Sequence, residues 1–102
     1  MTNTNDDATG APFRDQMTIA NSRGLHARAS AKFVKCAEQF DAIVLVTKDG
    51  QTVPGTSIMG LMMLGAQSGS TIDVEVSGNQ AMQALEALRV LVDDRFGEDR
   101  DT

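Results

Sequence analysis

Residues 71–77 read Thr-Ile-Asp-Val-Glu-Val-Ser, and this stretch decides the fold class. Ile72, Val74 and Val76 alternate with polar residues, which is typical of a β-strand buried on one face only. After Ser77-Gly78-Asn79 the period changes, and one helical stripe running to about Arg95 is formed by Ala81, Leu85, Leu88, Leu91 and Val92. The strand therefore belongs to a sheet with helices on one face and water on the other.

The residues before this strand predict five further elements. Alternation predicts a short strand around residues 16–19, and a β-branched hairpin over residues 42–53 turns at Asp49-Gly50. A short helix over residues 58–64 opens after Thr56-Ser57 and closes at Gly65. A longer helix begins at His26, with a stripe formed by Ala29, Phe33, Val34, Ala37 and Phe40. The order βαββαβα predicts an α+β fold with a four-stranded antiparallel sheet and three helices on one face.

The length of 102 residues fits a single domain. Residues 1–14 are mostly small and polar, so we expect a flexible N-terminal tail and a folded body over residues 15–97. Residues 98–102 are mostly acidic and are expected to form a flexible C-terminal tail.

Charge and apolar patterning exclude several classes of partner. The net charge of −5 argues against nucleic acid, because binding to phosphate backbones depends on lysine and arginine. No apolar run is long enough for a membrane span or a signal peptide, so we expect a cytoplasmic protein without a membrane partner. The single cysteine, Cys36, cannot form an internal disulfide, and its apolar helical setting is that of a small buried hydrophobe.

The only histidine, His26, follows Gly24-Leu25 at the expected start of a helix. Neutral imidazole is a nucleophile near physiological pH, and a helix N-terminus stabilises an anionic product. Arg28 adds a permanent cation with donors suited to phosphate oxygens. The alternative is that His26 is a polar cap and Arg28 a solvated side chain. A metal site is not expected, because one histidine and one cysteine cannot supply a zinc ligand set, and no Gly-x-Ser-x-Gly elbow indicates a hydrolase.

The segment Ser57-Ile58-Met59-Gly60-Leu61-Met62-Met63-Leu64-Gly65 forms a helix too short to bury two faces. If Leu61 and Leu64 face the core, then Ile58, Met59 and Met62 are partly exposed and form an adaptable apolar patch for a partner. The alternative is that the methionines fill an irregular core. Ser57 suits the N-cap of this helix, which is a structural role.

Gly24-Leu25-His26-Ala27-Arg28, together with residues 57–65, resembles the two signatures of the HPr family. The resemblance covers about residues 16–96 and implies that family's fold, an open-faced β-sandwich with the same βαββαβα order. It also implies a bacterial phosphocarrier of the phosphoenolpyruvate-dependent phosphotransferase system, in which His26 accepts a phosphoryl group from enzyme I. The phosphohistidine then passes the group to an A-type enzyme II domain, and Arg28 steadies the phosphate.

The resemblance assigns roles to the second segment as well. Ser57 matches the family's regulatory serine, which in some bacteria a dedicated ATP-dependent HPr serine kinase/phosphorylase modifies. Ile58, Met59 and Met62 match the apolar positions that contact enzyme I and the acceptors, and Lys35 adds a cation at the rim.

Such a protein is a carrier and not an enzyme, requires no cofactor or metal, binds its partners transiently and is expected to be a monomer. Many members have proline after the arginine, whereas this chain has Ala29, which is a good helix former and should preserve the site. Members serve either sugar transport or nitrogen regulation; Ala29 and the acidic tails favour the nitrogen-related branch without deciding it. The alternative function is a regulatory binding protein that acts through the Ser57/Met59 patch and never carries phosphate.

Overall fold

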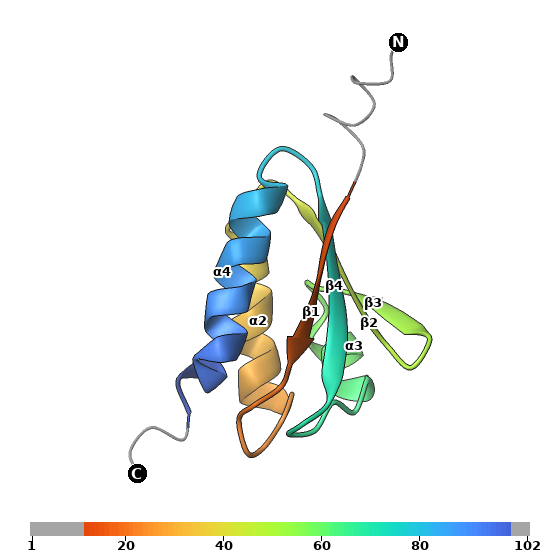
Figure 1. Cartoon of the computed structure of the whole chain (residues 1–102), viewed down its shortest axis with the longest axis vertical. Helices are drawn as coiled ribbons and strands as arrows, with labels where there is room; N and C mark the ends of the chain where they lie inside the picture. The colour runs from red at the N-terminus through yellow and green to blue at the C-terminus, as the bar shows by residue number, and fades with distance from the viewer. Residues whose placement is uncertain (1–11, 99–102) are drawn as a thin grey trace.

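The computed structural model describes residues 12–98 (Figure 1). Its elements occur in the order β1 (Phe13–Thr18), α2 (Ala27–Glu38), β2 (Ile43–Lys48), β3 (Gln51–Pro54), α3 (Ile58–Met63), β4 (Thr71–Ser77) and α4 (Ala81–Asp93). A single 3₁₀ turn, η1 (Arg95–Gly97), follows α4. The βαββαβα order predicted from the sequence is therefore confirmed within the described residues.

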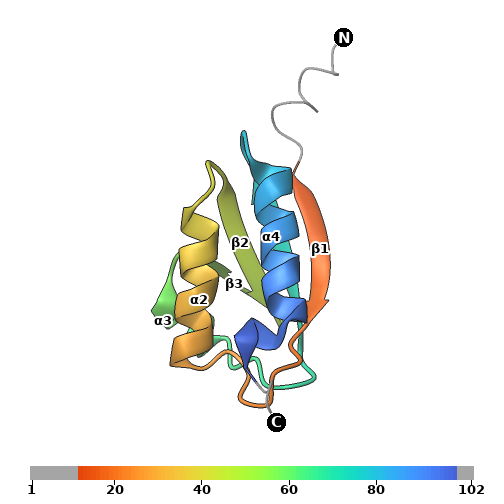
Figure 2. The same cartoon turned by 90° about the vertical axis from the view of Figure 1, so that its left-hand side faces the viewer.

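The four strands form one antiparallel sheet in the order β1-β4-β2-β3. Strand β4 pairs on both sides, with Val74 opposite Asp15 of β1 and Val46 of β2. The side chains of Ile72, Val74 and Val76 are completely buried, which confirms the alternation that identified this strand. Helices α2 and α4 lie across one face of the sheet, as Figure 2 shows, and α3 packs against α2 and β3.

The core lies between the sheet and these helices, because each helix turns one apolar stripe inward. Helix α2 buries Phe33 and Val34, and α4 buries Leu85, Leu88 and Val92. Leu91, which the stripe also included, is only partly buried against this core. Burial of such side chains is the main favourable term in the folding of a domain of this size.

Both predicted boundaries of the folded body differ from the structure. Strand β1 begins at Phe13, so Phe13 and Arg14, placed in the N-terminal tail, instead pair with Val76 and Glu75 of β4. At the other end Glu98, placed in the C-terminal tail, is a partly buried residue with side-chain hydrogen bonds. The remainder of the two expected tails, residues 1–11 and 99–102, lies outside the described residues.

A membrane-spanning helix would need a longer and more apolar segment than any helix found between residues 12 and 98.

Candidate functional site

His26 is the N-cap of α2. Its backbone is extended, with φ −76° and ψ −175°, and its carbonyl accepts the first helical hydrogen bond from Ser30 N–H at 2.9 Å. The ring nitrogen Nδ1 accepts a hydrogen bond from the backbone N–H of Arg28 at 3.3 Å. The prediction that the helix starts at the histidine is thus confirmed, and Nδ1 faces the helix N-terminus, where the macrodipole is positive.

The loop before His26 is fixed by hydrogen bonds on both sides. Leu25 N–H donates to the carbonyl of Ala66 at 2.9 Å, and Ser30 Oγ donates to the carbonyl of Leu25 at 3.1 Å. Gly24 has a φ of +67°, a conformation that other residues rarely adopt. The loop therefore holds the backbone of His26 in one place and joins it to the segment that follows α3.

The other ring nitrogen of His26 contacts a carboxylate. Nε2 lies 2.7 Å from Oε2 of Glu98, and the two side chains are only 17% and 10% exposed. The buried side chain of Asn21 donates from Nδ2 to Oε1 of the same carboxylate at 3.0 Å. Because Nδ1 already accepts a hydrogen bond from Arg28, the proton of the neutral ring belongs on Nε2, which donates it to Glu98.

Glu98 is a carboxylate at neutral pH despite its partial burial. Burial alone would raise the pKa of Glu98, but hydrogen bonds from Asn21 and His26, with electrostatic attraction to His26 and Arg28, lower the pKa below its ordinary value of 4.5. The site therefore pairs an imidazole with an ionised acid.

Neither Glu98 nor Asn21 was identified as a site residue from the sequence. Glu98 was grouped with the acidic residues that follow it, although Phe96, an apolar residue just beyond α4, is a signal that the chain continues into the core. Asn21 lies in a polar turn sequence, where nothing distinguishes a buried asparagine from an exposed one.

Arg28 lies in the first turn of α2, and its side chain is exposed. The guanidinium makes no hydrogen bond or ion pair with any residue between 12 and 98. It is therefore available to an anion that approaches His26. Ala29, the next residue, is completely buried in the same turn, so the helix begins normally without proline there.

The second predicted segment also forms as expected. Ser57 caps α3, and its Oγ accepts a hydrogen bond from Gly60 N–H at 2.9 Å. Leu61 and Leu64 are buried, which confirms the predicted inward face. The exposed apolar side chains are Ile58, Met59, Met62 and Met63, the last of which was not predicted; we call these four the α3 patch.

Helix α3, which carries the α3 patch, is connected both to α2 and to the loop before His26. Helix α3 packs against α2, and Ala66, shortly after α3, bonds to Leu25, the residue before His26. Lys35, predicted at the rim, is exposed on the last turn of α2. The exposure of Ile58, Met59 and Met62 is confirmed, while their role in binding a partner stays a prediction.

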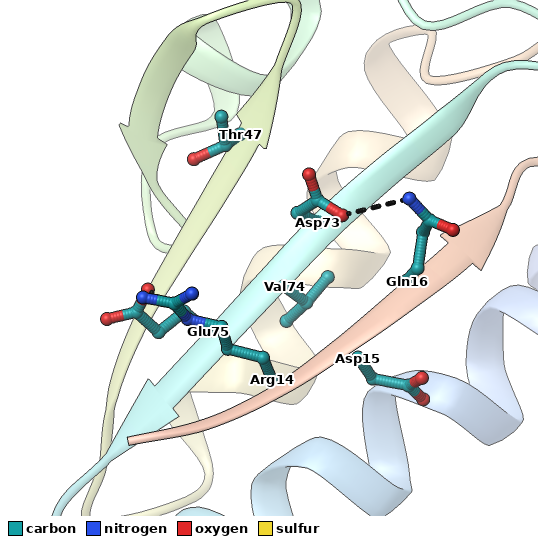
Figure 3. A pocket seen from close by; sticks show the side chains of 7 residues that line it. All are labelled: Arg14, Asp15, Gln16, Thr47, Asp73, Val74 and Glu75. Carbon is teal, nitrogen blue, oxygen red and sulfur yellow. Dashed lines mark hydrogen bonds and ion pairs between the residues drawn. The ribbon is translucent and has the colours of Figure 1, made fainter. Parts of the chain in front are cut away.

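A hollow on the open face of the sheet is separate from this site. It is lined by Arg14, Asp15, Gln16, Thr47, Asp73, Val74 and Glu75 (Figure 3). Its polar groups largely satisfy one another, because Gln16 donates to Asp73 at 3.3 Å and Arg14 pairs with Glu75 at 3.1 Å. The hollow thus presents no chemistry comparable to that of His26.

Metal and thiol chemistry find little support among residues 12–98. No three histidine, cysteine, aspartate or glutamate side chains of this range gather in a way that could hold a metal ion. Cys36 is a half-buried free thiol, and burial raises the pKa of this thiol, so it is protonated and weakly nucleophilic at neutral pH.

Comparisons with known proteins agree with this arrangement. The family model described as "PTS HPr component phosphorylation site" matches residues 13–94. The phosphocarrier protein HPr of Neisseria meningitidis is 47% identical over 86 residues, which cover 84% of this chain and 97% of the relative. The phosphocarrier protein NPr of Shewanella violacea is 40% identical over 83 residues, covering 81% and 91% of the two chains.

Solved structures give the same result. The crystal structure of HPr-C-His from Thermoanaerobacter tengcongensis superposes with a TM-score of 0.82 at 37% identity, covering 85% of this chain and 98% of that one. The fold, the histidine at the start of α2 and the extent of these matches lead to one conclusion: the chain belongs to the HPr family of phosphocarrier proteins.

Proposed function

We propose that this protein accepts a phosphoryl group from enzyme I on Nδ1 of His26 and passes it to an A-type enzyme II domain. The observation that carries the proposal is the unequal environment of the two ring nitrogens. Nε2 is 2.7 Å from a carboxylate, which would repel an incoming phosphoryl group, whereas Nδ1 accepts a hydrogen bond from the backbone N–H of Arg28 in the first turn of α2. Nδ1 is therefore the nucleophile.

The transfer is a simple displacement at phosphorus. The hydrogen bond from Arg28 N–H to Nδ1 opens, and the freed lone pair of Nδ1 forms a bond to phosphorus. The bond from phosphorus to the donor atom of enzyme I breaks at the same time, and that bond's electron pair leaves with the donor. The Nε2 proton stays on the ring, so the phosphorylated ring is cationic. In the second transfer the Nδ1–phosphorus bond breaks toward Nδ1, which restores the starting imidazole.

The first turn of α2 supplies the groups that stabilise the phosphoryl oxygens. The backbone N–H groups at the start of a helix lack intrahelical partners, and Arg28 N–H already points at Nδ1. The exposed guanidinium of Arg28 can add charge-assisted hydrogen bonds when the phosphoryl group arrives. The protein acts as a covalent carrier and supplies no substrate cavity.

The α3 patch is the proposed contact surface for both partners. Met59 is 68% exposed, and flexible methionines adapt to different partner surfaces. Lys35, which is exposed on the last turn of α2, is proposed as a cation at the edge of the surface that partners contact. Two partners that share one surface must bind in turn, so we expect a monomer that forms transient complexes in the cytoplasm.

Ser57 is proposed as a regulatory phosphorylation site for a dedicated serine kinase. Its Oγ lies at the N-terminus of α3, next to the α3 patch, where a phosphate would introduce close to two negative charges. The cost of desolvating that phosphate would weaken an apolar contact there. Phosphorylation of Ser57 would thus reduce partner binding without changing His26 itself.

The test is phosphorylation by enzyme I and phosphoenolpyruvate, followed by intact mass measurement. Wild type and Ser57→Ala should gain one acid-labile phosphate, and His26→Asn should gain none. Asparagine is chosen because it also caps a helix, so the fold is kept while the imidazole is lost. No label on wild type with an active, cognate enzyme I would refute the relay and favour the alternative, a regulatory protein that acts through the Ser57/Met59 patch.

Incubation of the labelled protein with purified A-type domains tests the second transfer of the relay. Labelled wild type should lose its phosphate to the cognate acceptor, and parallel assays with sugar-transport and nitrogen-related acceptors identify the branch. The cognate domain is the one that discharges the label fastest.

A further inference from the structure

The chain beyond α4 turns back sharply toward the histidine. Arg95, Phe96 and Gly97 all have positive φ values, of 57°, 55° and 74°. For the two residues with a side chain this conformation is unfavourable, so surrounding contacts must hold it. Those contacts are the complete burial of Phe96 and a 2.7 Å hydrogen bond from Lys32 Nζ to the Phe96 carbonyl.

The turn places the side chain of Glu98 beside His26, and a hydrogen bond from Asn21 holds it there. Oε1 of Glu98 accepts from Asn21 at 3.0 Å, and Oε2 faces Nε2 of His26 at 2.7 Å. Asn21 is completely buried and also donates to the Gly24 carbonyl at 2.8 Å. Both carboxylate oxygens are therefore engaged, and the group is oriented by the same loop that positions the histidine.

We propose that Glu98 is a positioning residue of the phosphocarrier reaction, whose carboxylate keeps a proton on Nε2 of His26 and stabilises the cationic phosphorylated ring. This inference rests on the proposed function. A carboxylate that holds the far nitrogen of an imidazole both orients the ring and favours its positive form.

The consequence concerns how readily the phosphoryl group leaves. When the bond between phosphorus and Nδ1 breaks, its electron pair returns to Nδ1. With the proton still on Nε2 the departing group is neutral imidazole; without that proton it is imidazolate, a far poorer leaving group. Glu98 thereby keeps the phosphoryl group transferable at neutral pH.

The first experiment examines the hydrogen bond in the unphosphorylated protein. The chain has one histidine, so its ring signals in proton and nitrogen NMR spectra are assigned without ambiguity. In wild type the Nε2 proton should be visible and protected from exchange with water, and in Glu98→Ala its signal should be lost. Glu86→Ala is the matched control, because Glu86 is exposed on α4 and its loss should leave the signal unchanged. A signal that persists in Glu98→Ala would overturn the inference.

The second experiment separates positioning from mere anchoring of the C-terminal turn. After labelling by enzyme I, the rate of phosphate loss is followed against pH in wild type, Glu98→Gln and Glu86→Gln. In Glu98→Gln a neutral hydrogen bond replaces a charge-assisted one, so phosphate loss should be about tenfold slower than in wild type at neutral pH. In acid the rates of the two proteins should converge, because the ring then gains its proton from water. Glu86→Gln should follow wild type.

The outcomes distinguish this inference from the function on which it rests. Labelling that proceeds normally, with the same pH profile in wild type and Glu98→Gln, would overturn the role of Glu98 alone. A purely structural role would lower the stability of Glu98→Gln and leave its pH profile in place, and that result would overturn the positioning role equally. Failure of wild type to accept phosphate would overturn both.

Discussion

Replacement of Gly24 by alanine tests how tightly the loop before His26 is built. A Cβ atom at this position would lie 2.4 Å from the carbonyl oxygen of Ala66 and 2.8 Å from the Cα atom of Gln67. Both are backbone atoms, and the Ala66 carbonyl is the one that accepts from Leu25 N–H at 2.9 Å. The clash therefore cannot be relieved by a side-chain rotation and must displace the hydrogen bond that holds the loop.

The expected loss of unfolding free energy in Gly24→Ala has two parts. A left-handed φ costs an alanine about 1–2 kcal/mol. Forcing a methyl group into occupied space costs about 1–3 kcal/mol more, so Gly24→Ala should lose about 2–5 kcal/mol of unfolding free energy. Gly65 is a matched control, because its φ is also +67° but a Cβ atom there meets nothing within 4 Å. Gly65→Ala should lose only the first part.

The assay is urea denaturation of wild type and both variants, followed by circular dichroism. The free energy of unfolding of a small domain is about 5–15 kcal/mol, so the expected difference between the variants is large enough to measure. Equal losses in Gly24→Ala and Gly65→Ala would refute the reasoning, since they would mean that the contact with the Ala66 carbonyl contributes nothing beyond backbone strain.

Three further outcomes are expected. Ser57→Ala should lower the unfolding free energy by about 1 kcal/mol, because Gly60 N–H loses its cap, whereas Ser57→Asp should not; urea titrations compare the two. Met59→Ala should change stability by less than about 0.5 kcal/mol yet slow labelling by enzyme I, measured as initial rate. Because folding lowers the pKa of Glu98, its ionised carboxylate stabilises the fold above about pH 4.5, and this stabilisation is lost as the pH falls through the lowered pKa. The stability difference between wild type and Glu98→Gln should therefore shrink on acidification, which urea midpoints measured across that range will show.

The sheet and its helices could be predicted because their patterns are local. The alternation over residues 71–77 reports directly on a strand with one buried face, and the α4 stripe reports on a helix with one buried side. The place of His26 at the start of a helix could also be predicted, because a helix start is marked by its own residues and their sequence neighbours.

The α3 patch shows where local sequence patterns no longer predict which side chains are exposed. A helix of six residues makes fewer than two turns, so its apolar residues cannot be assigned to faces by periodicity alone. Ile58, Met59 and Met62 were placed correctly because Leu61 and Leu64 were assumed to face inward. Met63 was not placed, although it is 76% exposed, because its exposure depends on how α3 meets α2 and β3.

Glu98 was missed for a different reason, which is that its role depends on a contact across 72 positions of the chain. Its neighbours in sequence, Asp99 and Asp101, make the segment resemble a solvated acidic tail. The position of Glu98 depends on Phe96, which is completely buried. Burial of Phe96 offsets the conformational cost of the left-handed backbone at Arg95 and Phe96, and it turns the chain back toward the start of α2. A single large apolar residue shortly after a helix end is thus a stronger boundary signal than the average charge around it. The predicted folded body already included Phe96 and ended at residue 97; extending it by one residue would have included Glu98 and brought an acid to the end that holds the only histidine.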